Sequence, residues 1–267
     1  MTSKTPITFL SLGWGVQSWT IAAMMALGEL PRADYLVHAD TTHERQATYE
    51  FAEQWTPWLG EHGLNVVTVM GDRTNVLSSW ASGVPGVMIP AFTDHHDTGE
   101  GGQLNRQCTS DWKIRAVRRY MSTKLAERGL KKTPAVTATV LGISWDEALR
   151  IRDSDVKYNV NEYPLVDARI RRSDCVAWLE AKGLPVPVKS SCVFCPYQSK
   201  VSWERLARAN GPDWDKAVRV DEAIRNKRDN FELFVHPSRR PLPEAVSNVD
   251  QMEMWPDASC DGGYCFV

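Results

Sequence analysis

Short apolar runs alternate with stretches of helical apolar spacing along the first seventy residues of the chain. The runs are of strand type, at Ile7–Leu10, Tyr35–Ala39 and Asn65–Met70. The stretches between them, Val16–Leu30 and Arg45–Leu59, have apolar residues at helical intervals. Strands that alternate with helices in this way predict a parallel sheet with helices packed against it.

The rest of the chain continues the pattern less regularly. Residues 71–107 are rich in Gly, Pro, Asp and His and predict a long irregular loop. The later predicted elements are a basic helix at Lys113–Leu130, a central strand at Ala135–Ile143, a helix from Ser173 or Asp174 to Lys182, and a helix that begins near Ser202. The last thirty residues are predicted to be loop-rich. We expect an α/β domain over 1–185 and a cysteine-containing extension over 186–267, packed as one unit.

The first predicted strand runs into a glycine-bearing turn, Ser11–Gly15, and then into a helix. This geometry directs backbone N–H groups and a helix N-terminus at an anion. Ser11 and Ser18 flank the turn and add hydroxyl donors, so Ser11–Ser18 is interpreted as a phosphate-binding loop. It lacks the lysine of a Walker A loop and the third glycine of a dinucleotide fingerprint. Asp40 and Glu44 follow the second strand and are expected at the same rim.

Composition is that of an ordinary globular protein. The 267 residues are 43% hydrophobic and 24% charged, with a formal net charge of −2. This charge argues against bulk adhesion to nucleic acid but allows a local basic face. No apolar run is long enough to span a membrane and the N-terminus lacks a signal-peptide core, so we expect a cytoplasmic protein.

Six cysteines are then better interpreted as thiols or ligands than as structural disulfides. Cys192 and Cys195 form a C-x-x-C followed by proline, the local pattern of iron–sulfur, zinc and thioredoxin-like sites. Its late position, after a proline-rich turn, favours a cluster or metal over a thioredoxin-like role. The other thiols are those of Cys108, Cys175, Cys260 and Cys265. Cys175 is expected to be a buried thiol within a helix.

Several motifs occur together in one order. They are Ser11–Ser18, Asp40–Glu44, Arg106–Thr109 with Lys113, Gly142–Glu147 with Arg150, Tyr163–Leu165, Arg172–Cys175 and Cys192–Pro196. In combination the chain resembles the phosphoadenosine phosphosulfate reductase-like branch of the PP-loop ATP pyrophosphatase superfamily. The resemblance implies a Rossmann-like fold, mostly parallel, and an adenosine-bearing substrate, either ATP or an adenylyl sulfate. Leu12 and Gln17 depart from the family's loop pattern, and Gln17 puts metal contact there in doubt.

The expected nucleotide-binding residues surround the loop and the strand ends. They are Ser11, Gly13, Gly15, Gln17, Ser18, Asp40 and Gly142. Lys113 and Arg150 are expected to neutralise charge as pyrophosphate leaves. Mg²⁺ is expected with ATP, held by Asp40 or by Asp146 and Glu147, although these acids are equally typical of helix caps.

The resemblance also implies a cysteine ligand set. Cys108 matches the first cysteine of the pair found in cluster-bearing relatives, and Thr109 replaces the second. With Cys192 and Cys195 this makes three ligands of a [4Fe–4S] cluster, and the fourth is Cys260 or Cys265 or an open site. Zinc fits the same thiolates as an alternative.

Three functions remain open at this point. The leading one is ATP-dependent sulfur transfer, with a sulfur donor and with tRNA or DNA as acceptor. The second is a sulfonucleotide reductase in which Cys265 or Cys260 is the nucleophile and a thioredoxin-like protein the reductant. The third is a nucleotide-binding subunit, without activity of its own, of a nucleic-acid modification system. The nucleic-acid partner rests on basic stretches such as Arg115–Arg128 and Arg169–Arg172, and a homo-oligomer is left open.

Overall fold

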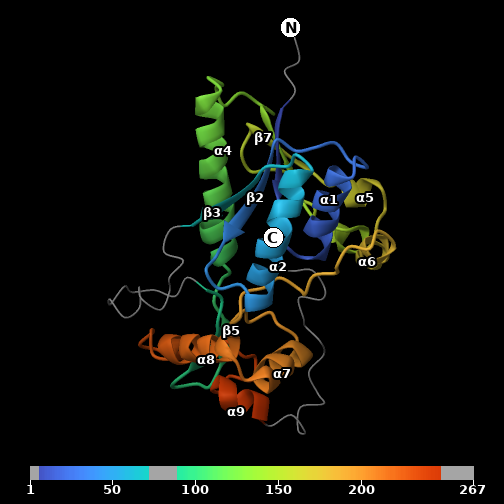
Figure 1. Cartoon of the computed structure of the whole chain (residues 1–267). Coiled ribbons are helices and arrows are strands. Elements are labelled where there is room, and N and C mark those ends of the chain that lie inside the picture. The colour runs from blue at the N-terminus through green and yellow to red at the C-terminus, as the bar shows by residue number, and fades with distance from the viewer. Residues whose placement is uncertain (1–5, 72–88, 248–267) are drawn as a thin grey trace. The chain divides into compact units, whose positions relative to one another are not determined.

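The computed structural model describes residues 6–71 and 89–247 (Figure 1). The chain divides into two compact units. Of the described residues, 6–71 and 113–190 make up the first unit, the sheet unit, and 89–112 and 191–247 make up the second, the cysteine unit. The boundary expected at 185/186 lies near the division at 190/191, whereas residues 89–112, expected in the first domain, group with the second unit.

The sheet unit is built on five parallel strands. They are β1 (Ile7–Ser11), β2 (Tyr35–Asp40), β3 (Val66–Met70), β6 (Thr137–Val140) and β7 (Asn159–Glu162). Their order in the sheet is β3-β2-β1-β6-β7, and every pairing is parallel. The expected α/β class, a mostly parallel sheet flanked by helices, is therefore confirmed. The chain adds β2 and β3 on one side of β1 and later adds β6 and β7 on the other side, so the sheet has its topological switch point at β1.

Helices cover both faces of this sheet. They are α1 (Val16–Ala26), α2 (Gln46–Glu61), α4 (Arg115–Glu127), α5 (Pro164–Asp167) and α6 (Arg172–Ala181). Leu10, Leu36 and Val140 pack with α1, α2 and α6 in one core. Phe9 and Val37 are adjacent to Leu10 and Leu36 in the chain and point to the other face of the sheet, where they pack against α4 (Figure 1). Alternate strand residues point to opposite faces, which is why both layers are apolar.

The cysteine unit is more regular than its sequence indicated. Strands β4 (Phe92–His95), β5 (Gly101–Gln103) and β8 (Phe231–Phe234) form an antiparallel sheet in the order β5-β4-β8. Two of these strands lie in the stretch 71–107, which was predicted to be irregular. Helix α7 (Lys200–Ala209) confirms the helix predicted to begin near Ser202. Helix α8 (Pro212–Ile224) was not predicted, and α9 (Leu242–Ser247) lies in the last thirty residues, which were predicted to be loop-rich. β4 and β5 are short and polar, so they carry little local strand signal.

A buried carboxylate organises this second unit. Asp221 on α8 accepts hydrogen bonds from the backbone N–H of Val235, at 2.9 Å, and of Leu242, at 3.0 Å, and it pairs with Arg225. It is fully buried. Burial raises its pKa, and the backbone donors and Arg225 oppose that shift. One side chain thus joins α8 to the residue that follows β8 and to the first residue of α9.

No helix among residues 6–71 and 89–247 combines the length and the apolar character that a membrane crossing requires.

Stability of the protein is expected to fall in acid because His236 is buried in its neutral form. Burial lowers its pKa from 6.5 to about 4. Between these values the unfolded chain binds a proton that the folded chain does not, so stability is lost as pH falls and is restored above about 6.5. The full loss is about 3 kcal/mol. Urea unfolding from pH 7.5 to 4 measures it.

The variant His236→Gln should flatten this part of the pH profile, whatever its stability at neutral pH. His96→Gln is the control, since His96 is exposed. A profile in which both variants keep the wild-type slope would contradict the assignment to His236.

Candidate functional site

The candidate nucleotide site lies at the carboxyl ends of β1, β2 and β6. Residues 12–15 connect β1 to α1 at the switch point of the sheet, where ligands of open parallel sheets bind. Trp14 lies in this turn with φ +56°, a left-handed conformation that costs a non-glycine residue about 1–2 kcal/mol. Its ring is buried and stacks on Trp19, with 6.1 Å between ring centres. Packing of the indole thus holds the strained turn in place.

The first turn of α1 presents backbone donors. Gly15 is its N-cap, no side chain caps the helix, and no acidic residue lies in the first turn. Among the described residues, the structure gives no acceptor for the N–H groups of Gly15, Val16 and Gln17. Such groups, together with the helix dipole, favour an anion at this end.

Ser18 acts inside the turn. Its hydroxyl accepts a hydrogen bond from Gly13 N at 3.2 Å and donates to Gly15 O at 3.3 Å. The sequence predicted this hydroxyl as a donor to phosphate. In this structure it bonds to both glycines of the turn and so helps to fix the shape of the loop. Its contact with phosphate stays a prediction.

The loop after β6 packs directly on α1. A Cβ atom at Gly142 would lie 2.8 Å from Ser18 N and 3.0 Å from its Cα, so only glycine fits without displacing backbone. Gln17 Nε2 lies 3.5 Å from Ser144 Oγ and 3.3 Å from Glu147 Oε2. Two of the predicted residues, Gln17 and Gly142, are therefore brought together across the switch point.

The two predicted cations are each paired with a glutamate. Arg150 is buried and donates to Glu147 Oε2 at 2.8 Å. Lys113 Nζ lies 3.2 Å from Glu44 Oε1, and the Glu44 side chain is 2% exposed. Both pairs belong to the sheet unit. Pairing keeps the buried charges compensated until a ligand competes for the cations.

The predicted acid Asp40 has a fixed orientation. Its Oδ1 accepts from Thr42 N at 2.7 Å and from the Tyr49 hydroxyl at 2.8 Å. The same hydroxyl accepts from Glu44 N at 3.3 Å. Burial raises the pKa of Tyr49, and Asp40 adds to that shift, so the phenol stays protonated and donates. The sequence pattern placed Tyr49 only among the apolar residues of a helix.

A second residue that the sequence pattern missed is His38. It lies buried on β2, and its Nδ1 is 3.0 Å from Leu12 O, so this nitrogen carries a proton and donates to the loop. Burial lowers its pKa, although Glu44 raises it. The neutral ring links β2 to the turn that follows β1. Its only sequence signal is a polar residue inside an apolar strand.

Asp146 and Glu147 do not cap the short helix η2 (Trp145–Arg150) that contains them. Asp146 accepts from Arg172 N at 3.0 Å and thereby satisfies the first turn of α6. Glu147 is held by Arg150 and Gln17, as above. Neither arrangement tests the expectation that these acids hold Mg²⁺.

Three of the predicted ligands, Cys108, Cys192 and Cys195, belong to the cysteine unit. Cys108 and Cys192 pack against one buried cluster that contains Val193, Phe194 and Trp112. The Arg106 guanidinium lies 5.4 Å from the centre of the Tyr197 ring. Burial raises the pKa of Tyr197, Arg106 opposes that shift, and Cys195 and Cys108 add to it.

The C-x-x-C turn itself is well supported. Cys195 N donates to Cys192 O at 3.0 Å, and the buried Gln198 amide donates to Val193 O at 2.7 Å. Cys108 immediately precedes a π-helical turn, η1 (Thr109–Ile114), a rare conformation that is frequent at functional sites.

These thiols do not by themselves form a complete metal site. Within the described parts of the chain, no three His, Cys, Asp or Glu side chains are grouped so as to hold a metal ion. Cys260 and Cys265, two further predicted site residues, lie outside the described residues. Cys175 is fully buried in the core of the sheet unit, which confirms the expected buried thiol, and burial raises its pKa to about 11.

The chain matches no protein-family model and no curated protein. Among solved structures it is similar to the crystal structure of phosphoadenylyl-sulfate (PAPS) reductase from Candida auris in a phosphate complex. The sequences are 15% identical, the match covers 69% of this chain and 76% of that chain, and the TM-score is 0.43. The fold assigned above rests on the strand order of this chain itself.

The contact at Gly142 makes a direct prediction. Gly142→Ala should destabilise the protein by about 1–3 kcal/mol, because the added methyl group forces the β6 loop and α1 apart. Gly60→Ala in α2 is the control, since nothing lies within 4 Å of a Cβ there. It should be neutral or stabilising by up to about 1 kcal/mol. Urea midpoints compare the two, and equal midpoints would show that the loops do not pack as described.

Proposed function

We propose that this chain binds ATP with its phosphates on the Ser11–Ser18 loop and uses it to activate an acceptor for sulfur transfer. The observation that carries the proposal is the first turn of α1. Its donors at Gly15, Val16 and Gln17 lie at the switch point of the sheet, without an acceptor among the described residues. The motif resemblance to PP-loop enzymes selects an adenine nucleotide among anions.

In the proposed reaction an oxygen of the acceptor attacks the α-phosphorus of ATP. The bond from that phosphorus to the bridging oxygen breaks, and pyrophosphate leaves with the electron pair. A sulfur nucleophile from the donor then displaces AMP from the activated acceptor. The protein's part in the first step is to hold the polyphosphate and stabilise the charge that develops on the leaving oxygen.

Lys113 and Arg150 are the cations proposed for that task. Lys113 is held against the buried Glu44 and Arg150 against the partly buried Glu147, so each is oriented before ATP arrives. Incoming phosphate oxygens would compete with Glu44 and Glu147 for these donors. Asp40, held by Tyr49 and Thr42, is proposed to contact the ribose or to help hold Mg²⁺.

We also propose that Cys108, Cys192 and Cys195 ligate a [4Fe–4S] cluster, with Cys260 as the fourth ligand, or alternatively zinc. The packing of Cys108 and Cys192 against one buried core and the hydrogen-bonded turn from Cys192 to Cys195 support this. Among the described residues no three His, Cys, Asp or Glu side chains are grouped so as to hold one ion, and Cys260 lies outside them. Such a cluster, when bound, would supply a site for the sulfur that is transferred. Cys265 is proposed as a thiol that takes part in the transfer.

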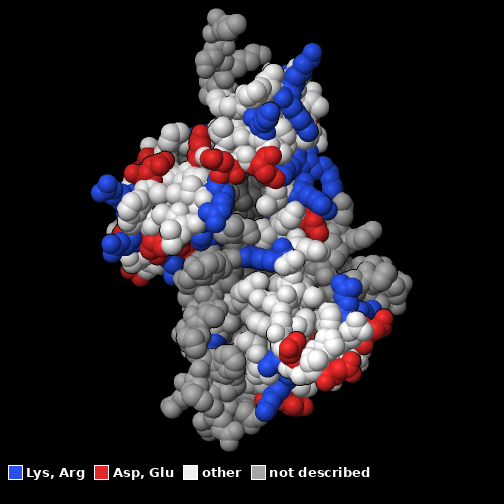
Figure 2. Space-filling model, turned by 180° about the vertical axis from the view of Figure 1, so that it is seen from behind, with Lys and Arg blue, Asp and Glu red and all other residues white. Residues whose placement is uncertain are grey.

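Nucleic acid is the proposed acceptor class, but not through α4. Figure 2 shows Lys and Arg side chains gathered at the edge of the sheet unit that carries α4. Several of these cations already have partners: Arg118 pairs with Asp155, Lys124 with Glu127 and Arg128 with Asp34. Neutralised cations contribute little to phosphate binding, so this helix is a weak candidate for the interface.

Lys113→Met should lower pyrophosphate release from ATP at least about 100-fold, mainly in kcat, if Lys113 stabilises the leaving group. Lys157→Met is the matched control because Lys157 is exposed. The assay needs the sulfur acceptor or its nucleic-acid pool, with Mg²⁺ present. Equal rates in wild type and Lys113→Met would remove Lys113 from the mechanism.

A parallel assay separates the reductase. Sulfite release from adenylyl sulfates with a thioredoxin-like reductant, without ATP, would replace the proposed function by sulfonucleotide reduction. Nucleotide binding without either turnover, restored by a partner protein, would favour a non-catalytic subunit.

If a [4Fe–4S] cluster is bound, protein purified without oxygen should contain iron and acid-labile sulfide in equal amounts. It should also show the visible absorption of such clusters, at about 400 nm. Cys192→Ser should lose both elements, and Cys175→Ser should keep them because Cys175 lies in the other unit. Zinc without sulfide would select the alternative metal. The absence of both metals would overturn the ligand assignment.

A further inference from the structure

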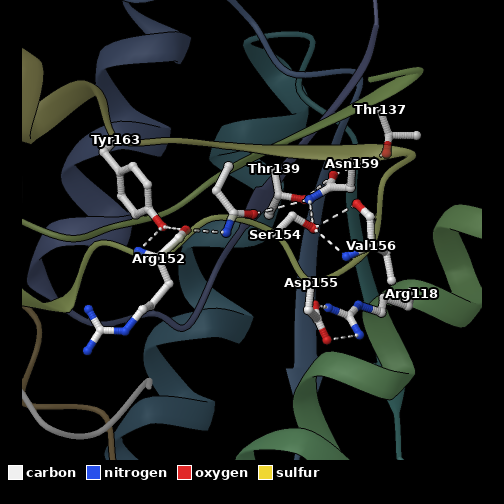
Figure 3. Close-up of polar contacts among 10 residues, drawn as sticks. Arg118, Thr137, Thr139, Arg152, Ser154, Asp155, Val156, Asn159 and Tyr163 are labelled. Atoms are coloured by element: carbon white, nitrogen blue, oxygen red, sulfur yellow. Dashed lines mark hydrogen bonds and ion pairs between the residues drawn. The ribbon is translucent and has the colours of Figure 1, made fainter. Parts of the chain in front are cut away.

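The edge strand β7 uses its polar side chains to hold the loop that precedes it in the chain. Asn159 donates from its amide to Ser154 Oγ at 3.3 Å, as Figure 3 shows, and Asn161 donates to Arg152 O at 2.9 Å. Tyr163 continues the same two-residue spacing and contacts the same loop. We call Asn159, Asn161 and Tyr163 the β7 clamp.

Tyr163 grips one residue of that loop by both of its backbone groups. Its hydroxyl donates to Arg152 O at 2.6 Å and accepts from Arg152 N at 3.1 Å (Figure 3). Since Asn161 donates to the same carbonyl, the Arg152 backbone is fixed from two sides. Tyr163 begins the motif Tyr163–Leu165, to which the sequence analysis assigned no role.

The clamp is anchored in the parallel sheet. Asn159 Oδ1 accepts from the hydroxyls of Thr137 and Thr139 on β6, at 3.1 Å and 2.9 Å. Its amide donates to Asn161 Oδ1 at 3.1 Å as well as to Ser154. Asn159 and both threonines are buried. Buried polar networks whose members are all hydrogen-bonded rigidify the segment that they hold.

Arg152 in turn fixes the backbone on both sides of Arg150. Its guanidinium donates to Leu149 O at 3.0 Å and to Ile151 O at 2.8 Å. These carbonyls belong to the residues immediately before and after Arg150. The clamp therefore reaches the main chain of Arg150 through a single intermediate residue.

The side chain of Arg150 continues this path to the nucleotide loop. The guanidinium is buried and donates to Glu147 Oε2 at 2.8 Å. The same oxygen lies 3.3 Å from Gln17 Nε2, in the first turn of α1. Hydrogen bonds and two short stretches of backbone thus connect the edge strand of the sheet to the loop after β1.

We propose that Tyr163 is a positioning residue for Arg150, and that its hydroxyl holds the guanidinium in register with the nucleotide loop. This role rests on the proposed function, which assigns Arg150 to the leaving pyrophosphate. Tyr163 acts through Arg152 and touches no ligand. Its ring packs in a small apolar cluster with Ile143 and Val166, which Tyr163→Phe would preserve. The variant therefore removes the hydroxyl and keeps the packing.

Hydrogen exchange of the ligand-free protein tests the clamp without reference to ATP. Tyr163→Phe should speed exchange in the peptide that covers residues 147–152 at least about 10-fold, because Arg152 N loses its acceptor and the segment opens more often. Exchange in α2 should stay as in wild type. Tyr158→Phe is the matched control, since Tyr158 directly precedes β7 and its hydroxyl has no hydrogen-bonding partner among the described residues.

Pyrophosphate release from ATP tests the role in the reaction. Tyr163→Phe should lower kcat about 10-fold with little change in KM, the signature of a displaced transition-state contact. Arg150→Lys keeps the charge but loses the planar fork, so it should lower kcat by itself. Adding Tyr163→Phe to Arg150→Lys should lower kcat by less than about 3-fold more, because the two residues act as one unit. A purely structural role would multiply the two losses.

The two measurements separate the clamp from the proposed function. Unchanged exchange in Tyr163→Phe, or losses of kcat that multiply, would overturn the role of Tyr163 while wild-type pyrophosphate release still supported the proposed function. Faster exchange in a protein whose wild type releases no pyrophosphate would overturn the proposed function, and with it the role of Tyr163 in the reaction.

Discussion

Contact between the first turn of α1 and the loop after β6 is the constraint on which the candidate site depends. Gly142 allows backbone to approach the Ser18 N–H and Cα without an intervening side chain. Two loops that leave the sheet on opposite sides of its switch point are thereby held together. Gln17 and Glu147 extend the contact outward. The backbone N–H donors of α1 lie on one of these loops and the buried cation Arg150 lies on the other, so this contact sets the position of both.

The buried charges of the sheet unit are paired with opposite charges before any ligand binds. Lys113 with Glu44 and Arg150 with Glu147 are pairs in which the glutamate is largely withdrawn from water. A buried pair adds little net stability, since desolvation offsets attraction, but it fixes the direction of both groups. Burial also lowers the pKa of His38, and its neutral ring joins β2 to the turn that follows β1. The site thus combines oriented cations with unused backbone donors, an arrangement suited to a polyanion.

Local pattern predicted the strands β1, β2 and β3 and the helices α1 and α2 because their apolar residues recur with the period of each element. It missed β7, whose sequence Asn159–Glu162 is mostly polar, and β4, which pairs with β8 more than a hundred residues later. Neither strand is apolar enough to be detected alone. Their hydrogen-bonding partners supply the stabilisation, and no local window contains them.

The sequence by itself determined the parallel α/β class, the glycine turn after β1 and the set of thiols, since each depends on residue type and short spacing. Only the tertiary structure decided that Tyr49 orients Asp40, that Ser18 braces the turn, and that residues 89–112 join the second unit. These outcomes depend on side chains and segments that meet across folded loops. Which groups meet is set by packing of the whole core, and periodicity along the chain does not encode it.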